Sequence, residues 1–469
     1  MLRLRSVEDD AEVRAGLDRI RVELGVPGPF PEAVRGEAVA AAARPPGGGE
    51  RADLREVPLF TLDPPGSMDL DQAMHLERRP GGYRVWYAIA DVAAFVRPGG
   101  AVDAEAHARG VTLYLPDAKA PLHPPELSEG AASLLPGRDR PAVMWTIDVD
   151  DRGATTGVDV RRALVRSRER LDYASADAAD PRVALLGEIG RMLQEAEAAR
   201  GGVDLPLAEQ EIEHGPDGWH LVLRGGVPSE GWNAQISLLT GRAAARLMLE
   251  GGVGLLRTMP PPRPEALERV RRTAVALGIG WPEGRSYGDV VRSLEPARPA
   301  HAAFLYESVA LLRGAGYVAF DGAPPEQAAH SAVAAPYAHV TAPLRRLADR
   351  YAAEVCLALA AGRPVPGWAR EALPGLPDTM RRALQRSGGV ERACVDLVEA
   401  LLLRDHVGES FDAVVVDTDP ERGGGQVQLV DPAVVARVEG ERPPLGAPVR
   451  VRLLEADPVR RLVRFALAG

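Results

Sequence analysis

The 469-residue chain contains a single lysine and only two cysteines. Arginine supplies every basic residue except Lys119, which indicates a codon-composition bias rather than a phosphate-recognition feature. The cysteines, Cys356 and Cys394, lie in apolar helical patterns, so we expect them to be buried free thiols. This cysteine usage favours a cytoplasmic location.

Long apolar runs are also absent. No stretch approaches the roughly 18 uninterrupted apolar residues of a membrane span, and the first ten residues lack the apolar core of a secretion signal. We therefore expect no membrane partner. The net charge of −10 argues against a protein that coats nucleic acid nonspecifically, although it leaves room for an enzyme with a local basic channel.

The length suggests about three domains, at ~150 residues each. Residues 1–50 carry two helical patterns followed by the linker Pro-Pro-Gly-Gly-Gly at 45–49. This short helical region is compatible with a helix-turn-helix-like nucleic-acid module and with a simple docking appendage, and both readings stay open.

Residues 51–409 begin with strand patterns, among them 82–96 and 143–149, and continue with helical patterns. A last long helix is expected over 381–408, with an interruption at the Ser-Gly-Gly of 387–389. Residues 410–469 contain five short strand patterns, typical of a small OB-fold barrel. The expected fold class is α+β: a mostly antiparallel sheet flanked by helices, followed by the barrel.

Three carboxylates stand together after the first strand pattern of the main domain. Asp63, Asp69 and Asp71 surround the rigid turn Pro-Pro-Gly at 64–66. Carboxylates this close stay ionised only with a compensating cation or hydrogen bonds. Mg²⁺ is the natural candidate, because it binds few protein carboxylates and leaves room for water and phosphate. Turn-capping aspartates are the simpler alternative; the spacing does not fit an EF-hand calcium loop.

Several motifs, in order, resemble the RNB-type catalytic domain shared by ribonuclease II and ribonuclease R. They are Thr-Leu-Asp-Pro-Pro-Gly-Ser-Met-Asp-Leu-Asp at 61–71, Ala-Ile-Ala-Asp-Val-Ala at 88–93, Arg-Gly-Val-Thr-Leu-Tyr-Leu-Pro-Asp at 109–117, Leu-Ser-Glu-Gly-Ala-Ala-Ser-Leu-Leu-Pro-Gly at 127–137, His-Val-Thr-Ala-Pro-Leu-Arg-Arg at 339–346, and Glu-Arg at 391–392. The terminal barrel is similar to an S1-like RNA-binding domain.

The resemblance implies a processive, hydrolytic 3′→5′ exoribonuclease. Such an enzyme degrades single-stranded RNA to nucleoside 5′-monophosphates and depends on Mg²⁺ or Mn²⁺. The RNA partner would enter a channel by its 3′ end, overhangs of structured RNA would be further substrates, and the protein would be a monomer.

The resemblance also assigns catalytic and metal-binding residues. Asp63, Asp69 and Asp71 fall on metal-site aspartates, and loss of charge at Asp71 is expected to abolish turnover most completely. Arg345 falls on an arginine that grips the phosphate near the scissile bond, where the planar fork suits bidentate contact. A surface ion pair is the alternative role for it. Gln72 stands where the family has a fourth aspartate, and its amide oxygen remains a candidate ligand.

Further residues fall on the RNA path. Tyr114 matches an aromatic residue that stacks on the terminal nucleotide, and Tyr173 resembles a second tyrosine of the path. Either ring could instead belong to the core. Arg346 is a candidate RNA contact beside Arg345. Glu391, counted among the catalytic residues, falls on a glutamate that accepts hydrogen bonds from ribose hydroxyls.

The chain departs from the family pattern in four ways. Gln72 replaces an aspartate, Ala88 replaces a histidine, and the segment 233–235 is neutral where an acidic pair is expected. We also expect no N-terminal cold-shock barrels, since only about 50 residues precede the motifs. These departures indicate a divergent branch and keep open an RNA-binding protein with a weakened or inactive nuclease site. A phosphodiesterase of small nucleotides is disfavoured because it gives the barrel no role.

Overall fold

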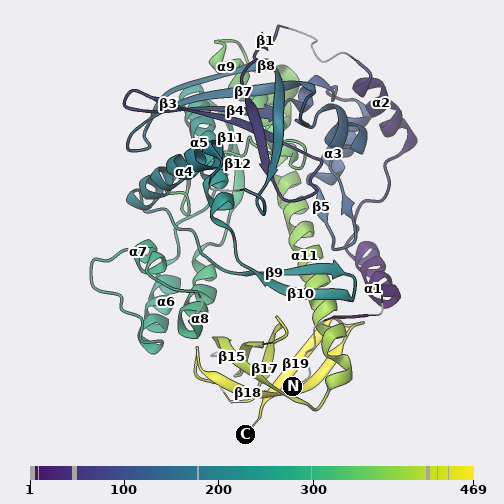
Figure 1. Ribbon diagram of the computed structural model, residues 1–469, viewed down its shortest axis with the longest axis vertical. Helices are drawn as coiled ribbons and strands as arrows, with labels where there is room; N and C mark the ends of the chain where they lie inside the picture. Colours follow the sequence, from purple (N-terminus) through teal and green to yellow (C-terminus); the bar gives the residue numbers. More distant parts are fainter. Residues whose placement is uncertain are drawn as a thin grey trace.

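The computed structural model describes residues 6–8, 10–44, 50–176, 179–296, 298–418, 423–429, 431–441 and 443–468. A strand-rich body lies at one end of the molecule and a small barrel at the other, with one long helix running between them (Figure 1). This arrangement confirms the expected α+β fold class.

A six-stranded sheet in the order β1–β8–β2–β3–β4–β7 forms the first body. Its strands are β1 (Ala52–Asp53), β2 (Leu59–Asp63), β3 (Gln72–Arg79), β4 (Gly82–Ala90), β7 (Asp139–Asp150) and β8 (Thr155–Asp172). The long β8 pairs with β7 through its first part and with β2 through its last part, so the sheet curls back on itself. The pairings of β8 with β1 and β2 are parallel and the others are antiparallel, so the sheet is mostly antiparallel, as predicted.

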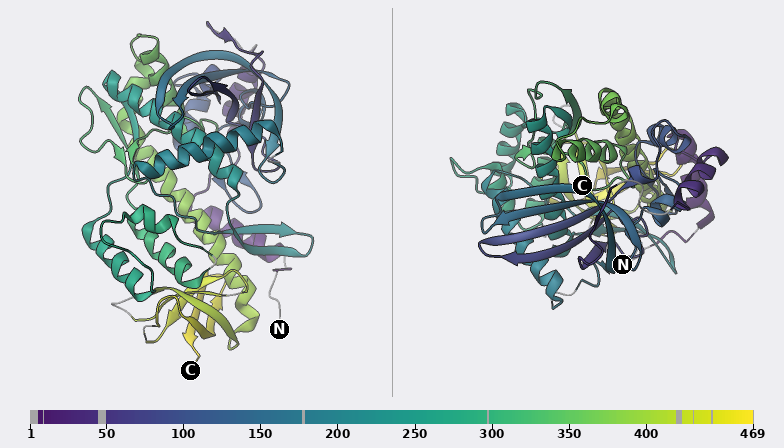
Figure 2. Two further views of the ribbon diagram at one scale, coloured as in Figure 1. Left: turned by 60° about the vertical axis from the view of Figure 1, so that its left-hand side comes forward. Right: turned by 90° about the horizontal axis from the view of Figure 1, so that it is seen from above.

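The longer helices lie behind one face of this sheet when the molecule is seen from above (Figure 2), whereas Ala88 and Met144 on its other face belong to a second hydrophobic cluster with Val34 and Val102. Apolar side chains of β4 and β7 meet α5 and α9 in the largest hydrophobic core. The helices of this body are α3 (Ala101–Arg109), α4 (Pro181–Ala199), α5 (Pro228–Gly251), α9 (Leu347–Ala360) and α10 (Gly367–Ala372), with the short helices η1 (Val92–Ala94), η2 (Glu126–Ala131) and η4 (Leu373–Gly375).

Short strand pairs and a helical subdomain complete the main body. The paired strands are β5 (Leu113–Tyr114) with β6 (Lys119–Ala120), β9 (Glu209–Gly215) with β10 (Gly218–Arg224), β11 (Val253–Thr258) with β12 (Gly316–Asp321), and β13 (Ala329–His330) with β14 (Ala335–Pro336). The subdomain has its own core and contains α6 (Pro264–Ala276), α7 (Tyr287–Arg292), α8 (Pro299–Ser308) and η3 (Val309–Leu311).

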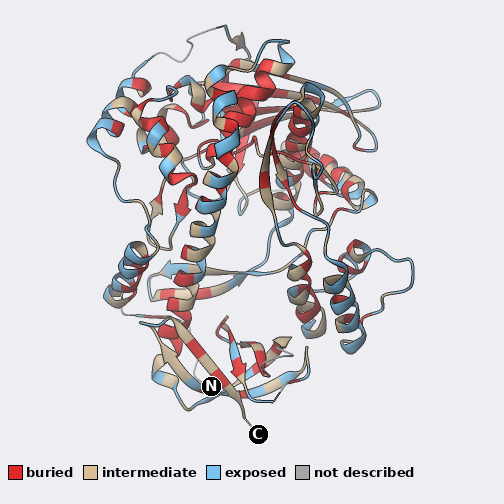
Figure 3. Cartoon of the chain, turned by 180° about the vertical axis from the view of Figure 1, so that it is seen from behind, coloured by how far each residue is buried: buried red, intermediate tan, exposed pale blue. Residues whose placement is uncertain are grey.

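The long helix α11 (Leu376–Leu403) runs without a break, so the expected interruption at 387–389 is wrong. Glycine in a helix interior costs about 1 kcal/mol relative to alanine, but an apolar stripe on both sides of Gly388 and Gly389 packs against the rest of the protein. That stripe consists of Met380, Ala383, Val390, Ala393, Cys394 and Leu397. Tertiary packing therefore outweighs the local preference. Figure 3 shows the helix buried where it meets the barrel and exposed along one side of its middle.

The C-terminal strands close into a five-stranded barrel in the order β15–β16–β17–β19–β18, which confirms the predicted OB-like barrel. Its strands are β15 (Ser410–Thr418), β16 (Gly425–Leu429), β17 (Val435–Glu439), β18 (Pro448–Asp457) and β19 (Leu462–Leu467), and η5 (Arg404–His406) leads into them. Alternating apolar residues fill the interior, with Phe465 fully buried.

Two N-terminal helices are present as predicted, α1 (Asp10–Glu23) and α2 (Glu32–Ala42). They lie far apart (Figure 1): α1 packs on α11, whereas α2 packs on α3 and η2. The linker prediction at 45–49 falls outside the described residues.

Three further details differ from the expectations or complete them. The strand expected over 82–96 ends at Ala90 and continues as η1. Within the motif at 109–117, Arg109 ends α3 and only Leu113 and Tyr114 form a strand, β5. The hairpin β9–β10 was missed within the half predicted to be helical.

Both cysteines are buried and free, as predicted. No helix in the described ranges is long and apolar enough to cross a membrane.

Candidate active site

The three aspartates lie on the loop from β2 to β3. Asp63 ends β2, and the chain then turns at Gly66, whose φ of 79° suits glycine. Leu70 points into the core between Asp69 and Asp71 and is fully buried. Its backbone N–H donates to Ser133 Oγ at 3.0 Å. The loop therefore has a fixed path, held by a serine that the sequence motifs contained but to which no role was given.

Asp71 joins this loop to the segment before α9, more than 270 residues later in the chain. The N–H of Leu344 donates to Asp71 Oδ1 at 2.7 Å, and Arg345 Nε donates to Oδ2 at 3.2 Å. Asp71 is 3% exposed, and burial raises the pKa of its carboxyl to about 7, although Arg345 opposes the shift. The Arg345 side chain is 45% exposed, so the guanidinium contacts Asp71 and also faces solvent.

Asp63 lies beside this pair with one carboxylate oxygen unused. Burial raises the pKa of Asp63 to about 6; Arg345 lowers it and the charge of Asp69 raises it. Its Oδ2 is buried and has no hydrogen-bond partner among the described residues. A buried oxygen without a hydrogen-bond partner lowers the stability of the fold, and a bound cation or water would provide the missing partner.

Asp69 is paired with a residue that the sequence reasoning left out. Lys119 Nζ lies 2.9 Å from Asp69 Oδ1 and 2.8 Å from Glu129 Oε1. The hydroxyl of Tyr114 lies 3.5 Å from Asp69 Oδ2. Tyr114 and Lys119 pair directly across the β5–β6 hairpin, which brings both to Asp69. The one signal in the sequence was that Lys119 is the sole lysine.

Gln72 lies in the same region, but both ends of its amide are already used. Its Nε2 donates to the carbonyl of Thr341 at 2.8 Å, and its Oε1 accepts from the hydroxyl of Tyr87 at 2.6 Å. Tyr87 in turn contacts Ser237 of α5 at 2.8 Å. The amide therefore ties β3 to the segment before Arg345, and any metal would have to share Oε1 with Tyr87.

The candidate RNA contacts differ in their exposure. Tyr114 is 54% exposed beside the aspartates. Tyr173 is half-buried: its N–H donates to the Asp63 carbonyl at 3.3 Å, and its hydroxyl accepts from Asn233 Nδ2 at 2.6 Å. Both tyrosines are thus near the aspartates, one as an open ring and one within a hydrogen-bond network.

Arg346 and Glu391 are placed differently. Arg346 makes two hydrogen bonds to the fully buried Asp349, at 2.9 and 2.7 Å, so its guanidinium is committed within the protein. Glu391 is exposed on α11, and within the described part of the chain no hydrogen bond or ion pair joins it to the aspartates. The structure therefore brings together Asp63, Asp69, Asp71 and Arg345, with Gln72, Tyr114 and Tyr173 around them, and leaves Glu391 apart.

The oxygen atoms of the loop fit a hard cation that takes few protein ligands. Among the described residues, no three His, Cys, Asp or Glu side chains converge as a ready-made metal centre. The carboxylate of Asp71 is nevertheless buried, that of Asp63 is half-buried, burial raises the pKa of both, and Asp63 has its free oxygen. Mg²⁺ is commonly held by one or two carboxylates, with water and substrate phosphate completing the shell.

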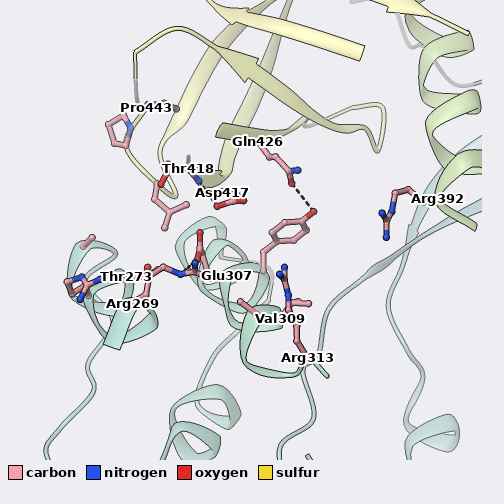
Figure 4. Close-up of a pocket in the computed structure, with 16 residues that line it drawn as sticks. Arg269, Thr273, Glu307, Val309, Arg313, Arg392, Asp417, Thr418, Gln426 and Pro443 are labelled. Atoms are coloured by element: carbon pink, nitrogen blue, oxygen red, sulfur yellow. Dashed lines mark hydrogen bonds and ion pairs between the residues drawn. The ribbon is translucent and has the colours of Figure 1, made fainter. Parts of the chain in front are cut away.

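A cavity of about 1280 Å³ opens between the helical subdomain and the barrel. Four arginines line it, Arg269, Arg272, Arg313 and Arg392, and Figure 4 shows Arg269, Arg313 and Arg392. The hydroxyl of Tyr306 bridges the cavity to the barrel by donating to Gln426 Oε1 at 3.1 Å. Arg272, Arg313 and Arg392 make no ion pair with any described residue, so their charges are available to an anion.

Known proteins share this architecture. Residues 51–360 match the family model of the RNB domain, and residues 409–468 match that of the RNase II-type exonuclease C-terminal S1 domain. Ribonuclease R of Escherichia coli (strain K12) is 30% identical over 334 residues, which cover 64% of this chain and 39% of the relative. Ribonuclease R of Thermotoga maritima is 25% identical over 509 residues, which cover 98% of this chain and 71% of the relative.

Solved structures agree with the fold. The apo form of Mycoplasma genitalium RNase R superposes with a TM-score of 0.86 at 18% identity, covering 98% of this chain and 78% of that one. Yeast Ssd1, described as a pseudonuclease, superposes with a TM-score of 0.66 at 14% identity, covering 94% of this chain and 57% of that one. The chain spans 39% of the Escherichia coli relative and 50% of ribonuclease R of Vibrio parahaemolyticus. On the two domain matches, the chain belongs to the RNB-domain family and carries that family's C-terminal S1 domain.

Proposed function

We propose that this protein is a processive 3′→5′ exoribonuclease that hydrolyses single-stranded RNA, including overhangs of structured RNA, to nucleoside 5′-monophosphates. The single observation that carries the proposal is the junction of Asp71 with Arg345 beside the free oxygen of Asp63. Metal-assisted phosphodiester hydrolysis uses a positive group that binds the phosphate and carboxylates that hold the metal ion. The half-exposed guanidinium and the incompletely compensated carboxylate pair are groups of these two kinds. A metal-dependent hydrolase is the reaction class of this family.

Arg345 and the two aspartates Asp63 and Asp71 have distinct roles in this proposal. Arg345 binds the phosphate next to the scissile bond through the part of its fork that does not contact Asp71, and this contact orients the phosphorus for attack. Asp63 and Asp71 hold the metal ion, for which we propose Mg²⁺ with Mn²⁺ as a substitute. The ion, when bound, neutralises phosphate charge and lowers the pKa of an attacking water.

The tyrosines and Glu391 act on the RNA. The open ring of Tyr114 stacks on the terminal base; stacking tolerates every base, as processive degradation requires. Tyr173 lines the RNA path next to Asp63, and the hydrogen bond that its hydroxyl accepts from Asn233 holds the ring in this position. Glu391, exposed on α11, accepts from ribose hydroxyls of nucleotides that have not yet reached the aspartates, which favours RNA over DNA. Arg346 supports the site from within by fixing the segment that carries Arg345.

The arginine-lined cavity supports a channel for the 3′ strand between the helical subdomain and the barrel. At about 1280 Å³ it exceeds the ~300–1,000 Å³ typical of small-molecule pockets. Its unpaired arginines suit a phosphate backbone. We retain the division into residues 1–50, 51–409 and 410–469, and propose a monomer located in the cytoplasm.

An RNA-binding protein without hydrolysis is the second candidate. Gln72 motivates it, because a neutral amide engaged by Tyr87 stands where the family has an aspartate. The resemblance to the yeast pseudonuclease adds weight, since it indicates that this fold does not by itself make a nuclease.

The test is a time course with a 5′-labelled RNA oligonucleotide, with Mg²⁺ or with a chelator. A 3′→5′ exonuclease shortens the labelled RNA stepwise and releases nucleoside monophosphates, and it does so only when Mg²⁺ is present. A binding protein shifts the RNA in a gel without shortening it. Asp63→Asn is the informative variant, because the unpaired Oδ2 means that the substitution breaks no hydrogen bond of that atom. We expect it and Asp71→Asn to bind RNA normally without cleaving it.

Normal turnover in both aspartate variants would contradict the site assignment. Asp159→Asn, on the exposed face of β8, is the matched control and should cleave at the rate of the unmodified protein.

A further inference from the structure

Lys119 is the sole lysine in a chain whose other basic residues are arginines, and it lies in the candidate active site. Its ammonium makes ion pairs with Asp69 and Glu129, at 2.9 and 2.8 Å. The side chain is 29% exposed, so both pairs are partly shielded from solvent. An ammonium is a compact point charge, whereas a guanidinium is a planar fork. The site therefore contains one cation of a different kind from all the others.

The β5–β6 hairpin, which is anchored outside the site, fixes the position of this ammonium. Lys119 begins β6 and pairs with Tyr114 of β5. The turn between these strands contains Asp117, which forms an ion pair of 2.5 Å with Arg21 of α1. A hairpin anchored at its turn delivers Lys119 to Asp69 without depending on a long flexible loop. Lys119 is thus a built element of the site.

Lys119 is the cation that lies between two carboxylates of the site, Asp69 and Glu129. The other cations at the loop act on different carboxylates: Arg345 pairs with Asp71, and the charges of Arg345 and Arg170 both lower the pKa of Asp63. Removing the ammonium would leave Asp69 and Glu129 as a donor set for a second ion.

We propose that Lys119 is the built-in cation of Asp69, so that the site binds one divalent ion, at Asp63 and Asp71, and not two. Two-metal nucleases place ions about 3.5–4 Å apart to stabilise the attacking and leaving oxygens. In this chain an ammonium fixed on Asp69 supplies the second positive charge. Lys119 acts through Asp69 and is a positioning residue. The inference rests on the proposed metal-dependent hydrolysis.

The test counts metal ions on the full chain without RNA. Metal-free protein is titrated with Mn²⁺, and bound ions are counted by electron paramagnetic resonance and by calorimetry. We expect one ion for the unmodified protein. Lys119→Met should bind a second ion, or bind the first at least roughly tenfold more tightly, because a unit charge a few ångströms away has been removed. Lys119→Arg, which keeps the charge, should bind one ion.

Glu129→Gln is the control for charge removal on the other side of the ammonium. It leaves the contact between Lys119 and Asp69 in place and should gain no ion. Two ions on the unmodified protein, or an unchanged count and affinity in Lys119→Met, would overturn the proposal. A protein that binds one ion but fails to shorten RNA would contradict the proposed function alone.

The single lysine also allows a test that needs no substitution. Acetylation of the folded protein removes the ammonium charge, whereas reductive methylation keeps it. Acetylated protein should behave as Lys119→Met and methylated protein as unmodified. Lys119→Arg, treated in the same way, reports the contribution of the terminal amine. Equal metal binding after acetylation and methylation would also contradict the proposal.

Discussion

Arg345 divides its guanidinium between the protein and the space in front of the aspartates. Nε contacts the buried Asp71, while nearly half of the side chain is exposed. Such a division needs several N–H groups in a fixed plane, which arginine has and lysine lacks. The same contact also compensates part of the charge on Asp71. One side chain thus stabilises the loop and presents a positive charge to a substrate.

Arg345→Lys tests this division. A lysine can pair with Asp71 or face the phosphate, but it cannot do both with one fixed geometry. Losing one charge-assisted hydrogen bond costs about 1.5–3 kcal/mol, so we expect kcat to fall roughly 10- to 100-fold while thermal stability changes little. Rates on a fluorescent RNA substrate measure this. Arg246→Lys, at an exposed arginine that pairs with Glu250 in α5, should leave kcat intact, and a similar loss there would count against a special role for Arg345.

Tyr114 offers a second test at this scale. Its ring is 54% exposed, and its hydroxyl contact to Asp69 is long, at 3.5 Å. If the ring stacks on a base, Tyr114→Phe should retain RNA affinity, whereas Tyr114→Ala should lose about 1–3 kcal/mol, or roughly 5- to 150-fold. Fluorescence anisotropy with Asp63→Asn as the background avoids cleavage. Equal affinities of the Phe and Ala variants would show that the ring does not stack.

Among elements, α11 shows how packing decides a local ambiguity. Ser387, Gly388 and Gly389 predict a break, yet they continue the helix. The glycine at 388 has negative φ, and a Cβ added there meets no atom within 4 Å. The residue is therefore a helical glycine without a steric reason for being glycine.

Gly388→Ala should stabilise the protein. Alanine removes conformational freedom from the unfolded chain and has the higher helix propensity, so the gain should be about 0.4–1 kcal/mol. Chemical denaturation measures it. Gly241→Ala in α5 is the opposite control, because its Cβ would lie 2.2 Å from the Tyr337 ring and 2.5 Å from the Ala338 carbonyl. A destabilised Gly388→Ala would mean that this position needs glycine after all.

Elements with local signals were predicted best. The five short strands expected over 410–469 all form, β16 and β19 among them, because short alternating patterns between turn residues depend on neighbours in sequence. The β9–β10 hairpin was missed, since its charged sequence Glu-Gln-Glu-Ile-Glu-His has little apolar alternation and its burial comes from Val7 and α11.

The same distinction holds for the site. The aspartate loop and Arg345 were found through motifs, but their mutual contact spans more than 270 residues. Lys119 lies outside every motif, and Glu129 and Ser133 lie within the motif at 127–137, but the contacts of all three with the aspartate loop are defined only by tertiary proximity. The commitment of Arg346 to Asp349 likewise follows from the folded segment and not from the arginine pair itself.

At the scale of the whole molecule, Glu399 connects the catalytic body to the barrel. This buried carboxylate on α11 accepts from Gln210 Nε2 of β9 and from the N–H of Val435 in β17, both at 2.8 Å. Burial raises the pKa of Glu399 from its ordinary 4.5 to about 7, although both hydrogen bonds oppose the shift. The folded protein therefore holds the proton more tightly than the unfolded chain does.

Stability should accordingly depend on pH at this junction. Because the folded pKa is raised, the contribution of Glu399 to the free energy of unfolding is complete below pH 4.5 and is lost as the pH rises through about 7. Glu399→Gln mimics the protonated form and should be more stable than the unmodified protein at pH 8, by an amount of order 2 kcal/mol. The two proteins should converge near pH 4.5.

Thermal unfolding at several pH values measures this difference. Glu265→Gln, on the exposed side of α6, is the control and should show no such divergence. A constant gap between Glu399→Gln and the unmodified protein at all pH values would contradict the assignment.

The length of the uninterrupted helix α11 determines how far the barrel lies from the hairpin that carries Tyr114. Ala383 touches the loop before the hairpin that carries Tyr114, and the helix reaches the barrel at its end, Leu403. The twenty residues between them span about 30 Å at 1.5 Å per residue, or roughly nine stacked nucleotides at about 3.4 Å each. An RNA fragment shorter than this cannot touch the aspartates and the barrel at once. On the proposed function, degradation should therefore proceed without release until about nine nucleotides remain and then turn distributive, leaving short oligomers as slow end products.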